Sequence, residues 1–166
     1  MLAITLLFLG ILSRLIIHVP NFTPVIAIAL FGGVYLSSRQ ALWLPLLLLA
    51  VTDILIGFHN TMPYTWSSIF FISLTGLWLK KHKSSKTIFI SSVWSSILFF
   101  VVTNFGVWLS GGLYPLTFVG LRDCFILAIP FFKYELLATC LYTVLFFGLY
   151  EVIAVRAKHT RFAHVL

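Results

Sequence analysis

Six stretches of almost purely apolar residues divide this chain, and short polar or proline-containing segments separate them. They cover about residues 2–18, 24–37, 41–58, 64–80, 87–109 and 132–155. A helix needs about 20 apolar residues to cross a bilayer. The later stretches are as apolar as the first, which argues against a signal peptide followed by a soluble domain. The pattern therefore predicts an all-α polytopic membrane protein, with six transmembrane helices in a single domain over residues 1–166.

The segment before the last apolar stretch has a different pattern. Gly112 and Pro115 give a turn signal at its start, and Pro130 marks its end. The apolar run between them is long enough for a short helix but too short to span a bilayer. We therefore predict a short interfacial or re-entrant helix before the last span, carrying Arg122 and Asp123.

The composition supports a membrane protein and argues against several other classes. Hydrophobic residues make up 61% of the chain and charged residues only 9%, whereas soluble domains usually contain about 25% charged residues. The formal net charge of +7 comes from residues that flank the apolar stretches. Nucleic acid is therefore not an expected partner, and the lipid bilayer is. Cys124 and Cys140 form no CxxC motif and are expected to be packing residues.

The positive charges are distributed unequally between the two ends of the predicted bundle. If the N-terminus lies inside, eight of the eleven lysine and arginine residues fall at the inner end. The inner residues are Arg39, Lys80, Lys81, Lys83, Lys86, Arg156, Lys158 and Arg161, and the outer ones are Arg14, Arg122 and Lys133. The positive-inside rule then predicts a multi-pass protein of the bacterial cytoplasmic (inner) membrane with both termini cytoplasmic.

The predicted outer end also collects hydrogen-bonding and aromatic side chains. Arg14 and Asp53 fall at similar depths on two parallel spans, where their opposite charges can neutralise each other. The other residues at this end are His18, Asn21, His59, Trp66, Asn104, Trp108, Tyr114 and Arg122. Ligand sites are usually apolar cavities with a few convergent polar groups. We therefore predict a substrate-binding site formed by these ten residues.

The residue types suggest a role for each part of this site. The arginines and histidines would donate hydrogen bonds to an anionic or carbonyl-rich group of the ligand. Asp53 and Asn104 would orient those donors or bind polar groups of the ligand, and the aromatic residues would stack on an apolar ring. The alternatives are structural. The ion pair can serve folding alone, the histidines can be loop residues at the interface, and Trp108 and Tyr114 can belong to an aromatic belt.

Sequence motifs for catalysis and metal binding do not occur in the chain. HExxH, GxSxG and closely spaced Cys/His clusters are missing, so we expect no catalytic residue, no metal site, no cofactor and no enzymatic activity. A nucleotide-binding motif is also missing, so the chain alone is not expected to couple to ATP.

Two small residues in the second stretch, Ala29 and Gly33, have the spacing that lets helices approach closely in lipid. Two interpretations are open: packing within the chain, and docking of a partner helix.

Four segments resemble a family of small bacterial membrane proteins. They are RLIIHVPNFTPVIAIALFGG, LAVTDILIGFH, TNFGVWLSGGLYPLTFVGL and AIPFFKYELLATCLYT. The similarity covers about residues 13–150 and is most specific at the Pro-Asn-Phe-Thr-Pro turn. That uncharacterised family is described as S components of energy-coupling-factor (ECF) transporters.

The resemblance implies a six-helix bundle that binds a vitamin or related micronutrient from the extracytoplasmic side. It also implies delivery by toppling in the membrane, after docking to an ECF T component and an ATPase pair. Characterised S components often carry an Ala-xxx-Ala face on their first helix, whereas here Leu7 follows Ala3. Ala29 and Gly33 are the nearest substitute. The alternatives are a solitary small-solute permease without an ATPase partner and a structural membrane subunit.

Overall fold

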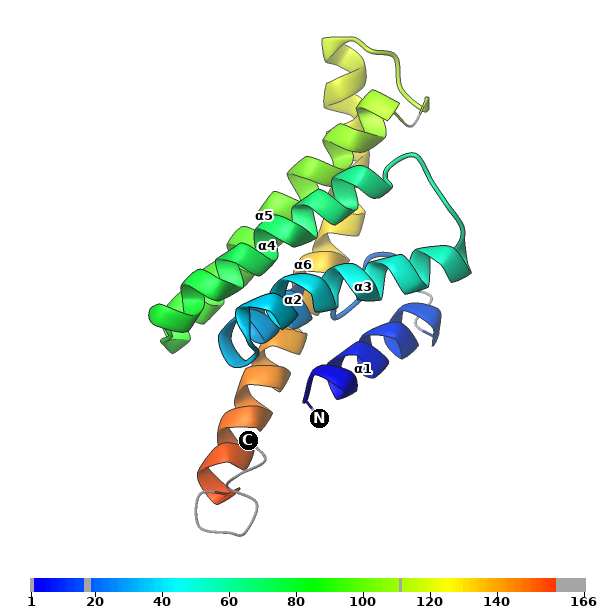
Figure 1. The fold of residues 1–166 in the computed structure, drawn as a ribbon. Helices are drawn as coiled ribbons and strands as arrows, with labels where there is room; N and C mark the ends of the chain where they lie inside the picture. Colours follow the sequence, from blue (N-terminus) through cyan, green and yellow to red (C-terminus); the bar gives the residue numbers. More distant parts are fainter. Residues whose placement is uncertain (1, 17–18, 111, 158–166) are drawn as a thin grey trace.

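The computed structural model describes residues 2–16, 19–110 and 112–157, and these residues form helices joined by short connections (Figure 1). The six described helices are α1 (Leu2–Ile16), α2 (Val25–Tyr35), α3 (Ser38–Ile56), α4 (Met62–Lys81), α5 (Ser85–Ser110) and α6 (Phe118–Ala157). This confirms the predicted all-α class. In Figure 1, α4 and α5 run side by side, and α1 lies beside α3.

Three helices are long and apolar enough to cross a membrane: α3, α5 and α6. Large apolar side chains are exposed along all three, including Trp43 on α3, Trp94 on α5 and Val144 on α6. Extensive exposed apolar surface is rare on soluble monomers, and contact with lipid would account for it. The chain is thus compatible with a membrane protein, while six complete spans stay a prediction.

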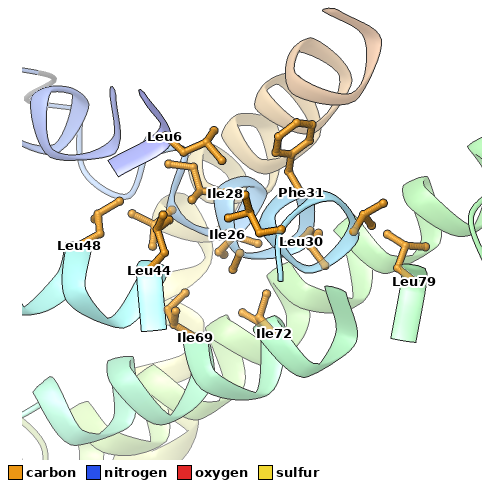
Figure 2. Close-up of a cluster of buried hydrophobic side chains, with 14 of the residues drawn as sticks. Leu6, Ile26, Ile28, Leu30, Phe31, Leu44, Leu48, Ile69, Ile72 and Leu79 are labelled. Carbon is orange, nitrogen blue, oxygen red and sulfur yellow. The ribbon is translucent and has the colours of Figure 1, made fainter. Parts of the chain in front are cut away.

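Helix α2 lies at the centre of the bundle and is buried from Val25 to Val34. Its 11 residues extend about 16 Å, about half the hydrocarbon thickness. A helix that is apolar on every side has no face for water and is normally buried. Figure 2 shows its residues Ile28, Leu30 and Phe31 among side chains from neighbouring helices. Those neighbours include Leu6 of α1, Leu44 and Leu48 of α3, and Ile69 and Ile72 of α4.

The small residues of α2 make a close backbone contact with α4. A Cβ atom built on Gly33 would lie 2.5 Å from Gly76 Cα and 2.7 Å from Leu77 N. A Cβ on Gly76 would in turn lie 2.8 Å from the carbonyl oxygen of Ala29. Both residues must therefore be glycine for the two backbones to approach so closely. Ala29 and Gly33 therefore pack against another helix of the same chain, which is the first of the two interpretations.

The prediction of a separate short helix between residues 110 and 131 is wrong. Helix α6 starts at Phe118 and continues through Pro130 to Ala157. Proline removes one backbone hydrogen bond, but long apolar helices tolerate this when neighbouring helices support them. Phe100 of α5 supplies this support, because its ring packs 5.5 Å from the ring of Phe125 and 4.7 Å from that of Phe132, one on each side of Pro130.

A polar cluster joins the C-terminal end of α2, the C-terminal part of α6 and the α4–α5 connection. Lys83 Nζ lies 2.6 Å from Glu151 Oε1, and the hydroxyl of Tyr35 donates a hydrogen bond to the same oxygen. Lys80 Nζ donates to the carbonyl oxygen of Leu36 just after α2 ends, at 3.1 Å. These contacts hold the C-terminal end of α2 against its neighbours.

Exposed ion pairs contribute little to stability. We expect Lys83→Ala to lower the free energy of unfolding by only about 0.2–1 kcal/mol, because both side chains of its pair with Glu151 are well exposed. Equilibrium unfolding in mixed micelles measures this change. A loss above about 3 kcal/mol would mean that the pair is buried by lipid or by a partner.

Candidate functional site

A buried ion pair connects the C-terminal part of α1 with that of α3. Arg14 Nη2 donates to Asp53 Oδ1 at 3.0 Å, which confirms the expected neutralisation of the two charges. Trp66 Nε1 of α4 donates to the other carboxylate oxygen, Oδ2, at 2.8 Å. Both carboxylate oxygens are thus used by protein donors, and the Asp53 side chain is only 2% exposed. Three helices thereby fix the position of the Arg14 guanidinium.

Local sequence explains why α1 can approach α3 at this point. A Cβ atom on Gly10 would collide with the side chain of Leu48 on α3 and would lie 2.9 Å from Ile28 Cδ1 on α2. Glycine at this position therefore brings the two helices together one turn before Arg14. Asp53 lies about one turn beyond Leu48, which places its carboxylate within reach of Arg14.

Arg14 also has a nitrogen that the protein does not use. Nη1 is buried and has no hydrogen-bond partner among the described residues. Guanidinium groups carry five donors, and buried polar atoms are nearly always paired. Because Nη2 is held by Asp53, the guanidinium keeps its orientation with Nη1 free. This side chain lines two cavities inside the bundle.

The two cavities have volumes of about 250 Å³ and 300 Å³ and share part of their walls. The shared residues are Arg14, Asn21, Thr65, Phe99 and Glu135. The smaller cavity reaches the first turn of α2 at Val25 and Ile26. The larger one extends toward His59 and Asn104. All six described helices, with the α1–α2 and α3–α4 connections, thus line a partly polar space.

The α1–α2 connection reaches these cavities through a residue in an unusual conformation. Asn21 has φ 60°, the left-handed region that asparagine tolerates better than most residues. Its carbonyl oxygen accepts a hydrogen bond from Thr23 N at 3.1 Å. The turn brings the chain back directly to the start of α2, so that Asn21 lines both cavities.

Glu135 is the residue in this site that sequence analysis missed. It lies on α6, is only 4% exposed and lines both cavities. Thr139 Oγ1 donates to its Oε1 at 3.1 Å, whereas Oε2 is buried and has no partner among the described residues. An ionisable residue inside an apolar span is by default a functional candidate. The sequence therefore did contain a signal, because Glu135 and Glu151 are the two acidic residues within the last apolar stretch.

The structure brings together part of the predicted site. Arg14, Asn21, His59 and Asn104 line the cavities, and Asp53 and Trp66 support Arg14 from behind. His59 Nδ1 interacts with Thr61 Oγ1 at 2.8 Å, and Asn104 Nδ2 donates to the carbonyl oxygen of Phe100 at 2.7 Å.

The other predicted residues lie elsewhere. Trp108 Nε1 donates to the carbonyl oxygen of Pro115 at 3.0 Å, and Arg122 forms an exposed pair with Asp123 at 2.8 Å. Tyr114 is not among the residues that line either cavity. His18 lies outside the described residues.

Within the part of the chain that the structure describes, no group of three or more His, Cys, Asp and Glu residues could hold a metal ion. The site instead offers one free donor on Arg14, one free acceptor on Glu135, several amide and hydroxyl groups, and apolar walls. Apolar walls with a few polar groups are typical of small-molecule pockets.

A family model described as "Family of unknown function (DUF6580)" matches residues 1–162. No curated protein and no solved structure matches the chain.

Proposed function

The chain belongs to this family of unknown function (DUF6580), and we propose that it is a membrane protein that binds a small solute in the cavities beside Arg14. One observation carries this proposal: a buried guanidinium, fixed by Asp53, lines an internal space and keeps one of its nitrogens without a partner among the described residues. A purely structural ion pair would be expected to satisfy all its buried donors within the protein. A solute that accepts a hydrogen bond from Nη1 would give this buried nitrogen the partner that it lacks.

The walls of the cavities fit a compact molecule with an apolar body. Ile26, Leu49 and Phe99 give apolar contact, while Thr65 and Asn104 provide hydrogen-bonding groups at the edges. Together the cavities are at the lower end of the volumes of small-molecule sites. This size favours a vitamin or related micronutrient over a peptide or a lipid chain.

The most specific form of the proposal is the substrate-binding subunit of an ECF-type importer. The similarity of residues 13–150 to a family described as S components supports it, as does the position of the site at one end of a helical bundle. The protein would lie in the bacterial inner membrane with cytoplasmic termini and a site open to the extracytoplasmic side. It would dock to a T component and an ATPase pair.

A solitary permease is the second candidate. The side of α2 that carries Ala29 and Gly33 packs on Gly76 within the chain, so the residues nearest to a docking pattern are not available to a partner. Co-purification separates the two candidates. Recovery of a T component and ATPases with the tagged protein supports the importer subunit, whereas uptake by cells that lack such modules supports the permease.

Thermal-shift measurements on the purified protein test solute binding itself. We expect at least one vitamin or cofactor precursor to raise the melting temperature, and Arg14→Lys to weaken its binding by about 10–100-fold. Lysine keeps the positive charge but has a single nitrogen, so it cannot bond Asp53 and the solute from two fixed positions as the arginine fork does. A hydrogen bond to a charged group is worth about 1.5–3 kcal/mol.

Arg122→Lys is the matched control, because Arg122 pairs with its neighbour Asp123 on the surface of α6. We expect unchanged affinity in this variant. If no compound stabilises the wild-type protein at saturating concentration, the proposed function is wrong. Equal affinity of the Arg14→Lys and wild-type proteins would show that the solute binds elsewhere.

A further inference from the structure

Glu135 is a buried carboxyl group for which the described part of the chain provides no positive charge. The ion pairs found there join Arg14 to Asp53, Lys83 to Glu151 and Arg122 to Asp123. Glu135 belongs to none of them, although its side chain is almost fully buried. Taking an acidic group out of water is costly unless a counter-charge and hydrogen bonds compensate it. Such a group is either neutral or paired with a cation that the described residues do not supply.

The geometry of Glu135 shows where that group would bind. Oε1 accepts a hydrogen bond from Thr139, one turn further along α6, and this contact fixes the carboxyl group. Oε2 has no partner and is shielded from solvent. Glu135 lines both cavities, and a rotation of its side chain would bring this oxygen to a molecule in that space. One carboxylate oxygen is thus held by the protein and the other is left for a donor.

The charges around the cavities are not balanced. Arg14 is already neutralised by Asp53 at 3.0 Å, so its remaining donor suits a neutral acceptor such as a carbonyl oxygen. Glu135 has no such partner and suits a cation. A solute with a carboxylate or phosphate would place a second negative charge in the same low-dielectric space. An anion beside a carboxylate that has no counter-ion would be repelled.

We propose that Glu135 binds a positively charged group of the solute, a protonated amine, while Arg14 Nη1 donates to a neutral acceptor on the same molecule. This inference rests on the proposed function and specifies its substrate class. An ammonium group is small, carries several donors and forms strong charge-assisted hydrogen bonds with a carboxylate. The solute is thus an amine-bearing compound with a carbonyl or similar acceptor. This differs from the anionic ligand that the sequence alone suggested.

Matched pairs of small probes test the sign of the charge without knowledge of the natural solute. The pairs are benzylamine with benzoate, and methylammonium with acetate, added to protein in nanodiscs at equal ionic strength. We expect each amine to raise the melting temperature of the wild-type protein more than its acidic counterpart does. We also expect Glu135→Gln to weaken amine binding by about tenfold or more, because the amide keeps the shape but not the charge.

Glu151→Gln is the control variant, since Glu151 is another carboxylate of α6 but lies in the exposed cluster with Lys83. It should respond to amines as the wild-type protein does. The proposal is overturned if neither amine stabilises the wild-type protein, or if Glu135→Gln responds equally well. Stabilisation by Na⁺ with the same dependence on Glu135 would assign the carboxylate to an inorganic ion and would also overturn it.

The same experiment separates this inference from the proposed function. If benzoate or a vitamin without an amine stabilises the wild-type protein and Arg14→Lys removes that effect, the solute site stands and only the role of Glu135 is wrong. If no probe and no compound of the vitamin panel stabilises the protein, both are wrong.

Discussion

Replacing Asp53 with asparagine is expected to destabilise the folded protein by about 3–5 kcal/mol. The substitution leaves the charge of Arg14 buried without a counter-ion, and removal of one partner of a buried pair has a cost of this size. It also changes the acceptor of the Trp66 hydrogen bond, so two contacts of α3 weaken together. Equilibrium unfolding in mixed micelles with increasing detergent fraction measures the loss.

Asp123→Asn is a close control for this prediction. Asp123 also pairs with an arginine, at 2.8 Å, but both side chains are about half exposed. Its loss should therefore cost about 1 kcal/mol or less. Equal destabilisation by the two substitutions would show that water reaches Arg14 and Asp53 in the folded protein.

Removing both charges separates folding from binding. The double variant Arg14→Met, Asp53→Leu should recover most of the stability lost in Asp53→Asn, because apolar replacement of a buried ion pair is often neutral or stabilising. The recovered protein should still fail to bind solute, since it lacks the Nη1 donor. A stable double variant with wild-type affinity would assign the pair to structure alone.

The apolar pattern was sufficient to predict most of the helices but not their depth or their continuity. Each of the six stretches contains a helix, because backbone groups in an apolar environment must bond within their own segment. Helix α2 is nevertheless only 11 residues long and is buried among the other helices. Pro130 shows the second limit. Locally it is a helix-breaking residue, but the packing of Phe100 on Phe125 and Phe132 outweighs this preference.

The candidate site was predictable in part for a similar reason. The positions of Arg14 and Asp53 in the sequence predict a similar depth in the bundle, and their pairing follows from the cost of isolated charges there. Sequence position does not define which side of a helix faces inward, and therefore Arg122 was expected in the site although it lies on the surface of α6. Glu135 lies near the predicted start of the last span at residue 132, whereas the continuous helix α6 places it well inside the helix.

The second large effect concerns the contact between α2 and α4. Gly33→Ala is expected to lower the free energy of unfolding by about 3 kcal/mol or more, at the upper end of what overpacking costs. The added methyl group would lie 2.5 Å from Gly76 Cα and 2.7 Å from Leu77 N, and backbone atoms cannot move aside as a flexible side chain can. The same unfolding assay measures this change.

Two other glycines provide the controls for this substitution. Gly32 is the preceding residue of α2, and a Cβ there would meet only Leu36 Cδ1, at an ordinary 3.4 Å. Gly148 on α6 has nothing within 4 Å of the added atom. Alanine favours helix over glycine by about 1 kcal/mol, so Gly148→Ala should stabilise the protein slightly and Gly32→Ala should change little.

The outcome at Gly33 also decides between the two interpretations of the small-residue pair. If Gly33→Ala unfolds the bundle while Gly148→Ala does not, the glycine maintains the contact with α4 that holds the central helix. The smaller cavity is lined by Val25 and Ile26 at the start of the same helix, and its shape would change if that helix moved. If Gly33→Ala leaves stability unchanged but abolishes association with an ECF T component, the glycine serves docking, and α2 must separate from α4 when the partner binds.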